Sequence, residues 1–469
     1  MTEQSNEQHR SIFANPILPS DEYIPDPEVH VFGERVYIFG SHDEFNGKMY
    51  CDNDYVTWSA PVEDLTDWRY EGVIFKKTDH QSPIKKGKTN MYAPDVAQGP
   101  DGAYYLYYSI ADSSVISVAK SDHPTGPYNY YGDVKRPNGK VYGEEESDYF
   151  EFDPAVLVDG DKVFLYSGSG QKANEKNGHP VVGLFVRELQ QDMLTSKGEP
   201  VILMPANDDR KKPNFFEAAS VRKIGEWYYL VYMATDLSGL HYMMSKYPDR
   251  GFEHKGLLYS TSKNLLNDGT SVQDAHLIDN NHGSIEEING EVYVFNHRHT
   301  NRSHFSRQVV GDKVTMNEDG TFEPTEYTSY GLRDKPFNEL TAYPATMTCG
   351  LMNTKDPSKA PYITQETRQD GEGTYSLIKE MIDGTQLEYK SFDLPEARRL
   401  SLRIRGEATG LIRVERFTSN HYEERLDISI SSSKWETVEI DLLQVSELFD
   451  VTLSYSGEGH FDIQTLAFH

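Results

Sequence analysis

A repeated strand pattern constrains the fold of this chain more than any other feature. Five segments each follow a turn and then alternate aromatic with aliphatic residues: ERVYIFGS (34–41), GAYYLYYS (102–109), DKVFLYSG (161–168), EWYYLVYM (226–233) and EVYVFNHR (291–298). Their central aromatic residues lie 68, 59, 65 and 64 residues apart: Tyr37, Tyr105, Phe164, Tyr229 and Tyr293. Short strands at such a period are typical of radial repetition. The pattern predicts a five-bladed β-propeller over residues 12–325.

The repeat stops near residue 325, and the rest of the chain has a different pattern. Residues 340–469 contain short alternating segments such as LEYKSFDL, RLSLRIRG and HFDIQTLAF. Strands at this spacing favour a β-sandwich. The predicted fold class is therefore all-β, a five-bladed β-propeller followed by a β-sandwich domain.

Charge and composition exclude several classes of partner. The net charge of −28 argues against binding to nucleic acid and to anionic membrane surfaces. The chain contains no run of about 18 apolar residues, so no membrane span is predicted. The N-terminal residues MTEQSNEQHRS lack the features of a secretory signal, and Cys51 and Cys349 form no metal-binding spacing. We expect a cytoplasmic protein, or a secreted one if the chain has been trimmed. The oligomeric state is left open.

Each repeat also carries one polar residue 10 to 12 positions before its central aromatic residue: Asp26, Asp95, Asp153, Glu217 and His282. In a propeller, equivalent positions of the innermost strands face the central axis, so these side chains are expected to converge at one end of the channel. Several acids are desolvated together only at a cost, and such groupings are typical of catalytic or cation-binding sites.

Simpler interpretations exist for some of these residues. Asp26-Pro27 and Asp153-Pro154 also suit ordinary turns, because Asp-Pro favours turn initiation. His282 alone would suit the protein core, and Asp95 would serve equally to brace a loop or to line a site. The shared register of all five is what favours function.

The sequences around these residues resemble the blade motifs of glycoside hydrolase family 43, which contains β-xylosidases, α-L-arabinofuranosidases and arabinanases. Four motifs occur in the expected order: Tyr23-Ile24-Pro25-Asp26-Pro27-Glu28, Tyr92-Ala93-Pro94-Asp95-Val96, Phe152-Asp153-Pro154-Ala155 and Phe216-Glu217-Ala218. The resemblance covers residues 12–325 and implies a five-bladed propeller that hydrolyses glycosides with inversion. Phe152 stands where the related fructan-cleaving propellers have arginine, so that group is set aside.

The resemblance also implies a role for each residue. Asp26 corresponds to the general base, Asp153 to the residue that orients the acid and tunes its pKa, and Glu217 to the general acid. His282 corresponds to a histidine that holds a cation near the axis, which implies Ca²⁺. One departure is that Ala218-Ala219 follows the acid, where Gly-Pro is common.

Glycoside hydrolysis explains why the site needs this set of groups. One carboxyl must stay protonated and another ionised, on opposite sides of the anomeric carbon. Phe215 and Phe216 provide an apolar setting that would raise the pKa of Glu217, and a neighbouring ionised Asp153 would raise it further. The residues expected to bind substrate or support the base are Phe45, Tyr92, Asp95, Phe152 and Arg298, with Arg298 as the candidate cation beside Asp26.

The C-terminal region resembles family 6 carbohydrate-binding modules, with Trp435 near a common strand start and Asp462 and Thr465 near usual sugar-binding positions. A structural module packed on the propeller is the alternative. For the whole chain we predict an inverting hydrolase that removes α-L-arabinofuranosyl or β-D-xylosyl units from plant-derived (arabino)xylan or arabinan oligosaccharides. The competing hypotheses are a non-catalytic carbohydrate-binding propeller and a structural scaffold.

Overall fold

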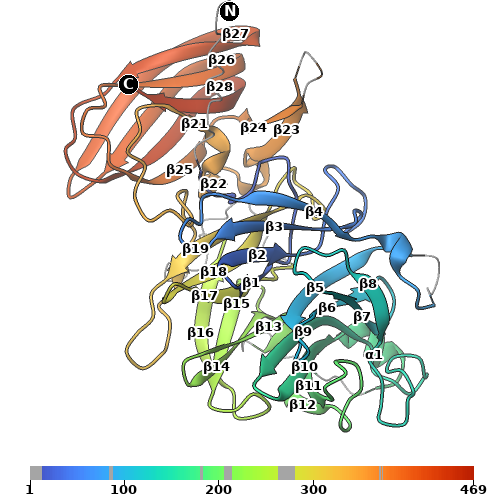
Figure 1. Ribbon diagram of the computed structural model, residues 1–469. Helices are drawn as coiled ribbons and strands as arrows, with labels where there is room; N and C mark the ends of the chain where they lie inside the picture. The colour runs from blue at the N-terminus through green and yellow to red at the C-terminus, as the bar shows by residue number, and fades with distance from the viewer. Residues whose placement is uncertain are drawn as a thin grey trace, which may run out of the picture.

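The computed structural model describes residues 13–83, 88–179, 183–204, 214–261, 280–368, 371 and 373–469. It consists almost entirely of β-strands, arranged as a five-bladed propeller and a C-terminal β-sheet domain (Figure 1). The predicted all-β class and the five-bladed propeller are confirmed; the predicted first residue of the propeller, residue 12, lies outside the described residues. Within these residues, no helix has the length and apolar character needed to cross a membrane.

Each of the first three blades is a four-stranded antiparallel sheet. Blade 1 contains β1 (Glu28–Phe32), β2 (Arg35–Phe39), β3 (Tyr55–Pro61) and β4 (Arg69–Phe75). Blade 2 contains β5 (Met91–Gln98), β6 (Tyr104–Ile110), β7 (Ile116–Ser121) and β8 (Asn129–Asp133). Blade 3 contains β9 (Glu151–Asp159), β10 (Lys162–Ser169), β11 (Leu184–Leu189) and β12 (Val201–Met204), with helix α1 (Gln171–Lys176) after β10.

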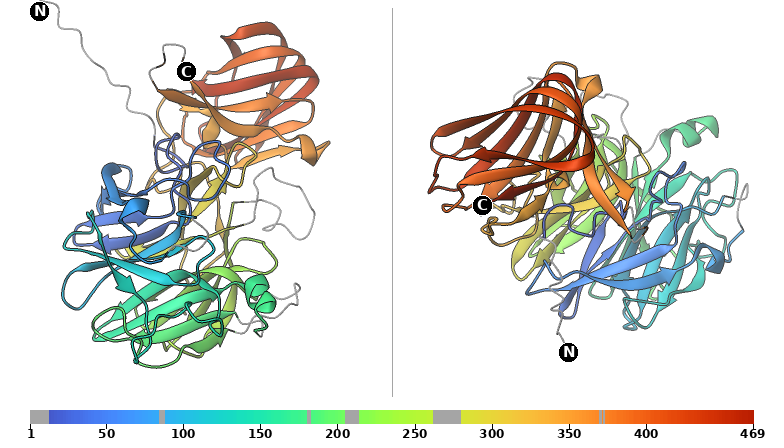
Figure 2. Two further views of the ribbon diagram at one scale, coloured as in Figure 1. Left: turned by 90° about the vertical axis from the view of Figure 1, so that its right-hand side faces the viewer. Right: turned by 90° about the horizontal axis from the view of Figure 1, so that it is seen from above.

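The last two blades complete the ring seen in Figure 1, and in both views of Figure 2 the C-terminal domain, orange to red, lies to one side of the propeller. Blade 4 contains β13 (Phe215–Ile224), β14 (Trp227–Ala234), β15 (Leu240–Ser245) and β16 (Glu253–Ser260), and β20 (Thr325–Glu326) pairs in parallel with β16. Blade 5 contains β17 (Ser284–Ile288), β18 (Glu291–His299) and β19 (Arg307–Val314). The repeated segments of the sequence are the second strands of the blades, β2, β6, β10, β14 and β18.

Hydrophobic clusters hold neighbouring blades together, because the apolar face of each blade packs against the next blade. One buried cluster lies at each of the five boundaries between blades. Between blades 4 and 5, for example, Val231, Leu258, Ile285 and Val294 are fully buried. Each fully buried aliphatic side chain of this kind contributes roughly 1.5–3 kcal/mol to stability.

The N-terminal segment closes the ring against blade 5. The side-chain amide of Asn15 donates to the carbonyl of Gly311 at 3.1 Å, and the Gly311 N–H donates back to Asn15 Oδ1 at 3.1 Å. The Ile17 N–H donates to the Val309 carbonyl at 3.3 Å. Because these residues lie almost 300 positions apart in the chain, this contact ties the first blade to the last.

The C-terminal domain forms a single hydrogen-bonded sheet with its own buried core. Its strands are β21 (Ala342–Pro344), β22 (Gly350–Asn353), β23 (Tyr362–Thr367), β24 (Thr374–Met381), β25 (Thr385–Phe392), β26 (Arg399–Phe417), β27 (His421–Asp441) and β28 (Phe449–Phe468). Strand β28 is central: β26 pairs along its whole length on one side, and β25, β24 and β21 share the other side. Short 3₁₀ turns lie at Lys77–Asp79, Ala345–Met347 and Pro357–Lys359.

The C-terminal domain packs on blades 1 and 5 of the propeller. The Asn301 N–H donates to the Ile363 carbonyl at 2.7 Å, and the Tyr23 hydroxyl donates to Gln365 Oε1 at 2.9 Å. Ala14 of the N-terminal segment belongs to the hydrophobic core of the C-terminal domain. The two domains therefore share core residues as well as polar contacts.

Candidate active site

All five blades contribute to one cavity of about 320 Å³ at an end of the propeller axis. It is lined by Asp26, Tyr50, Cys51, Tyr92, Ala93, Ile110, Asp112, Ser113, Phe150, Phe152, Asp153, Glu217, Asn280, His282 and Arg307. The cavity lies at the lower end of the size range of ligand sites, and it combines aromatic walls with a few convergent charged groups. Such a site suits one small sugar unit better than a long chain.

Strand register explains why the predicted residues meet there. Asp26, Asp153 and His282 each lie four positions before the residue that pairs with the central aromatic residue of the blade. Glu217 lies five positions before its counterpart, because a β-bulge between Glu217 and Ser220 adds a residue. These side chains therefore form one ring around the axis, as the sequence pattern predicted.

The two aspartates share an unusual backbone conformation. Asp26 has φ of 56° and Asp153 has φ of 49°, the left-handed region that non-glycine residues seldom adopt. Each precedes a proline, and such a conformation costs on the order of 1–3 kcal/mol. Strain kept at equivalent positions of two blades is typical of residues whose side chains must be aimed at a functional site.

The Asp26 side of the cavity is organised by one arginine from β19. Arg307 Nη1 donates to Asp26 Oδ1 at 3.0 Å. Asp43 holds the same guanidinium from the other side, with Nε to Oδ2 at 2.9 Å and Nη2 to Oδ1 at 3.0 Å. All three side chains are buried, so Asp26, Arg307 and Asp43 form an ion-pair network shielded from solvent.

His297 adds a neutral contact to Asp26. The Asp26 N–H donates to His297 Nδ1 at 3.2 Å, so the ring must carry its proton on Nε2. Burial, with the positive charge of Arg307, holds the pKa of His297 well below its usual range. His297 therefore fixes the backbone of Asp26 without adding a second positive charge.

The Glu217 side has the opposite electrostatics. Burial, followed by the negative charge of Asp153, raises the pKa of Glu217 to about 8. Burial and the charge of Asp26 likewise raise the pKa of Asp153 to about 6, although His282 opposes this shift. Near neutral pH, Glu217 therefore keeps its proton, which is the state that a general acid needs.

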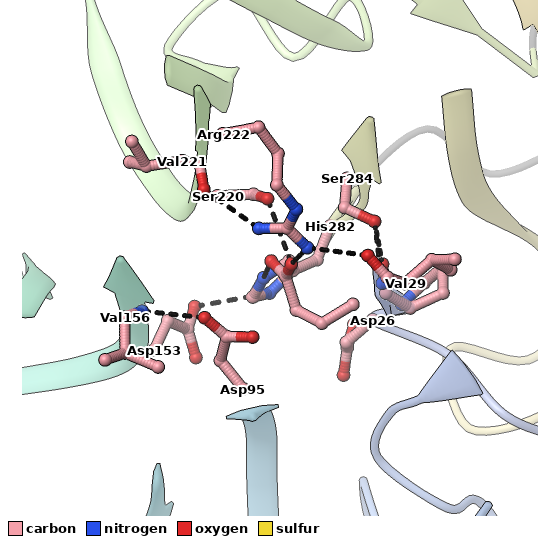
Figure 3. Close-up of polar contacts among 12 residues, drawn as sticks. Asp26, Val29, Asp95, Asp153, Val156, Ser220, Val221, Arg222, His282 and Ser284 are labelled. Carbon is pink, nitrogen blue, oxygen red and sulfur yellow. Dashed lines mark hydrogen bonds and ion pairs between the residues drawn. The ribbon is translucent and has the colours of Figure 1, made fainter. Parts of the chain in front are cut away.

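Beneath the cavity, a charged network crosses the axis (Figure 3). Arg222 Nη2 donates to Glu28 Oε2 at 2.7 Å and to the Val29 carbonyl at 2.9 Å, and Arg222 Nε donates to Glu286 Oε2 at 2.8 Å. Ser220 also donates to Glu28 Oε2 at 3.0 Å. This network joins blades 1, 4 and 5 and supports the floor of the cavity.

His282 lies between this network and the cavity. Its Nδ1 is 3.8 Å from Asp153 Oδ2, and its Nε2 is 3.8 Å from Glu28 Oε1. Burial lowers the pKa of His282, but the attraction of Glu28, Asp153 and Asp26 outweighs it and raises the pKa to about 9. In the absence of a metal, His282 is therefore a positively charged neighbour of Asp153.

The same histidine offers a place for a cation. Within the described residues, neither His282 Nε2 nor Glu28 Oε1 has a hydrogen-bond partner, although both atoms are buried. One imidazole nitrogen and one carboxylate oxygen that face each other fit a hydrated cation, whose other ligands would be water. A second group of three possible ligands, Glu28, His30 and Asp95, is already occupied by its own hydrogen bonds and by Arg222.

Asp95 does not reach the cavity, which corrects the expectation that it lines the substrate site. It is fully buried, and its carboxylate accepts from His30 Nε2 and from the N–H groups of Val96 and Val156, each at 2.7 Å. Asp95 pairs with Tyr107, two positions after the central aromatic residue, as Glu28 pairs with Phe39 and Ser220 with Val231. Asp95 is therefore equivalent to Glu28 and Ser220 beneath the cavity, although its distance of 10 positions from Tyr105 is close to that of the cavity residues in the other blades.

Two other expected residues also lie elsewhere. Arg298 is fully buried and donates to the Thr346 carbonyl at 2.7 Å and to Tyr327 and Gln308, so it joins blade 5 to the C-terminal domain. The cation beside Asp26 is Arg307 instead. Phe45 packs on the ring of Tyr23, with centroids 5.5 Å apart, and is absent from the cavity lining. Tyr92 and Phe152 do line the cavity.

Several site residues gave no signal in the repeat: Asp43, Tyr50, Cys51, Asp112, Phe150, Asn280 and Arg307. Most of them lie in connections between strands, which the blade period does not specify. Arg307 is the exception, since an arginine at the start of the third strand of blade 5 is a charged residue in strand context. That feature would have made Arg307 a second candidate, together with Arg298, for the cation near Asp26.

Comparison with known proteins assigns the same region to one family. Residues 13–322 match the family described as glycosyl hydrolases family 43. The chain is 38% identical to a xylosidase/arabinosidase of Thermoclostridium stercorarium, over 96% of this chain and 98% of that protein. It is 32% identical to xylosidase/arabinosidase 43A of Humicola insolens, over 48% of this chain and 76% of that protein.

Solved structures agree on the fold. A family 43 arabinoxylan arabinofuranohydrolase from Bacillus subtilis, in complex with cellotetraose, aligns over 97% of both chains with 20% identity and a TM-score of 0.52. A family 43 β-xylosidase/α-arabinofuranosidase from a compost microbial metagenome, in complex with xylotriose, covers 67% of this chain and 98% of its own, with 26% identity and a TM-score of 0.53.

Proposed function

The chain belongs to glycosyl hydrolases family 43 and is a glycosidase of the xylosidase/arabinosidase type, and we propose that it acts from chain ends with inversion. Its proposed substrates are plant-derived (arabino)xylan or arabinan oligosaccharides, from which it removes α-L-arabinofuranosyl or β-D-xylosyl units. The observation that carries this proposal is one cavity in which Asp26 is paired with Arg307 while the pKa of Glu217 is raised to about 8.

In the proposed reaction, the two carboxyl groups act at the same time on opposite sides of the sugar. Glu217 gives its proton to the glycosidic oxygen as the bond from that oxygen to the anomeric carbon breaks. A water molecule attacks the same carbon from the other face and gives its proton to Asp26. Arg307 holds Asp26 Oδ1, which leaves Oδ2 for the water. The products are the inverted sugar and the free leaving group.

Asp153 has the proposed role of tuning the acid. Its negative charge is the main electrostatic cause of the raised pKa of Glu217. His282 and Arg307 oppose this effect, so the charge balance around the ring keeps Glu217 protonated yet able to give up its proton. A purely carbohydrate-binding propeller has no need of carboxyl groups with such different pKa values.

Calcium is proposed to bind near the propeller axis, held by His282 Nε2 and Glu28 Oε1, with water molecules as its other ligands. A bound cation would supply positive charge next to Asp153. Metal analysis of dialysed protein is expected to show bound calcium. Dialysed protein without any bound ion, together with activity that a chelator leaves unchanged, would contradict this assignment.

A panel of 4-nitrophenyl glycosides tests the proposed activity. The largest initial rate is expected on the α-L-arabinofuranoside or the β-D-xylopyranoside, with hexopyranosides far slower. Nuclear magnetic resonance of the first sugar released is expected to show the inverted anomer, because the water attacks from the face opposite the leaving group. A first product of retained configuration would remove Asp26 from the role of base.

A further inference from the structure

Two histidine rings meet on the outer strands of blade 4. His241 lies on β15 and His254 on the neighbouring strand β16, and both strands are labelled in Figure 1. His241 Nδ1 and His254 Nε2 are 3.0 Å apart, and the two rings lie at 26° to each other with centroids 5.3 Å apart. His241 is buried, whereas His254 is exposed to solvent. The hydrolysis proposed at the propeller axis uses neither residue.

The turn before β15 determines which nitrogen of His241 carries the proton. The Ser238 hydroxyl donates to Asp236 Oδ1 at 2.8 Å, so its single proton is already used there. In the contact of 2.7 Å between Ser238 Oγ and His241 Nε2, the donor must therefore be Nε2. The Nδ1 atom of the neutral His241 ring is left with its lone pair, which faces His254 Nε2.

Such an arrangement is typical of a histidine that binds a metal ion. A metal-binding histidine usually donates its second ring N–H to an outer partner, which fixes the ring and makes the ligating nitrogen more basic. Here the outer partner is Ser238, and the carboxylate of Asp236 lies 3.6 Å from the same nitrogen. Partial burial, followed by the charge of His241, lowers the pKa of His254. The His254 ring is therefore neutral near pH 7, the form that ligates a metal.

The separation of the two nitrogens also fits a shared ion. Metal–imidazole bonds of about 2.0–2.1 Å, at angles of roughly 90–110°, place two nitrogens roughly 2.8–3.4 Å apart. The observed distance of 3.0 Å lies within this range. With its one proton on Nδ1, the neutral His254 ring offers a lone pair from Nε2 as well. Because this ring is exposed, it can turn toward the ion without disturbing the core.

We propose that His241 and His254 form a binding site for a divalent transition metal of the Zn²⁺ class. Imidazole nitrogens suit Zn²⁺, Cu²⁺ and Ni²⁺, whereas Ca²⁺ prefers oxygen ligands. Among the described residues, no third histidine, cysteine, aspartate or glutamate lies close enough to complete the set. Water molecules supply the remaining ligands. The site differs in place and in chemistry from the calcium site proposed near the axis.

A metal at this position acts on the turn between β14 and β15. Leu237, at the centre of this turn, lines a second cavity of about 470 Å³, which Glu217 and helix α1 also line. The ion joins β15 to β16 and holds the His241 ring against Ser238. Metal binding is therefore expected to raise the melting temperature of the protein, because the folded state alone presents both ligands together.

Titration of the full chain with Zn²⁺ tests the proposal. The protein is freed of metal by dialysis against a chelator and then kept in excess Ca²⁺, which fills sites that prefer a hard cation. Calorimetry is expected to show one Zn²⁺ bound at blade 4, and the melting temperature should rise with the Zn²⁺ concentration. His254→Ala should weaken this binding roughly 10–100-fold or more, since losing a ligand costs at least as much as losing an outer partner. His254→Phe keeps a ring against His241 without a ligating atom and should have the same effect.

His123→Ala is the matched control. His123 is also exposed but lies after β7 of blade 2, so this variant should bind Zn²⁺ as the wild type does. Asp236→Asn keeps both ligands and removes the carboxylate behind Ser238, so a smaller loss of affinity is expected. A wild type that binds no Zn²⁺, or His254 variants that bind it as tightly as the wild type, would overturn the proposal. Equal weakening in His123→Ala would overturn it too, because binding would then be a general property of surface histidines.

Discussion

The two sides of the axial cavity are built in opposite ways. On the Asp26 side, Arg307 is held between two carboxylates, and the C-terminal domain braces the neighbouring loops through Asn301. On the Glu217 side, the carboxyl adjoins a second cavity, and no described residue donates a hydrogen bond to it. One side holds a carboxylate in a fixed position against an arginine, and the other keeps a carboxyl protonated near neutral pH.

This difference shows how one propeller can give two carboxyl groups different surroundings in a small space. The blades supply equivalent positions, so the fold alone makes Asp26, Asp153 and Glu217 alike. What separates them is the neighbour that each blade provides, an arginine in blade 5 for the base and an apolar strand segment with a nearby negative charge for the acid. The predictions below disturb one side at a time.

The largest effect is expected from removing the brace on the Asp26 side. Deleting the residues beyond 335 removes the partners of Tyr23 and Asn301 and one acceptor of Arg298, the Thr346 carbonyl, and it exposes Ala14. No soluble, active protein is expected, because an apolar surface loses its cover and a buried arginine loses an acceptor. Soluble yield and the rate on a small glycoside provide the measurement. A soluble truncated propeller with full activity would show that the brace is dispensable.

A smaller loss of activity is expected when only Asp43, which anchors Arg307, is changed. Asp43→Asn keeps the shape of the side chain but removes one of the two negative charges that position the guanidinium. The kcat should fall roughly a hundredfold with little change in KM, since Asp26 is then less well placed. Steady-state kinetics of the variant check this.

Glu44→Gln provides the matched control for that substitution. Glu44 is the next residue in the same loop, and its side chain is exposed. Removing its charge should leave kcat within about twofold of the wild type, as for most exposed positions away from special contacts. Equal losses in the two variants would indicate a general effect of charge rather than the anchoring of Arg307.

The smallest effect concerns pH on the Glu217 side. The wild-type kcat/KM should fall as pH rises past about 8, because Glu217, whose pKa is raised to about 8, then loses the proton that it must donate. Asp153→Asn removes a charge that raises this pKa, so the basic limb should move to lower pH by roughly one unit. A pH profile of kcat/KM shows the shift. A basic limb that stays at the same pH or moves to higher pH would show that Asp153 does not raise the pKa of Glu217.

Regular turns decide how much of this site could be predicted from the sequence. Asp26, Asp153, Glu217 and His282 were found because two-residue hairpin turns keep their distance from the central aromatic residue nearly constant. In blade 2 the same count fell on Asp95, which has the register position of Glu28 and Ser220 and so lies below the cavity. A count along the chain cannot reveal such an offset, because it does not show which residues pair across the hairpin.

Contacts distant in sequence explain the rest. Arg307 contacts Asp43, which lies 264 positions away in the chain. Arg298 and Arg307 both lie in blade 5, and the sequence does not favour one over the other as the cation beside Asp26. Only the packing of the C-terminal domain shows which of them is directed away from the axis. The second cavity depends on α1, a short helix within a connection of blade 3, which the blade period does not predict.

The division of roles between the two sides is tested most directly by the dependence on the leaving group. Glu217→Ala and Asp26→Ala are compared by kcat/KM on an oligosaccharide and on a 2,4-dinitrophenyl glycoside of the same sugar. A good leaving group departs with little help from an acid, whereas the water needs a base whatever departs. Glu217→Ala should therefore lose roughly 10²–10⁴-fold on the oligosaccharide and far less on the dinitrophenyl glycoside. Asp26→Ala should be equally impaired on both; rescue of Asp26→Ala by the good leaving group would contradict the assignment.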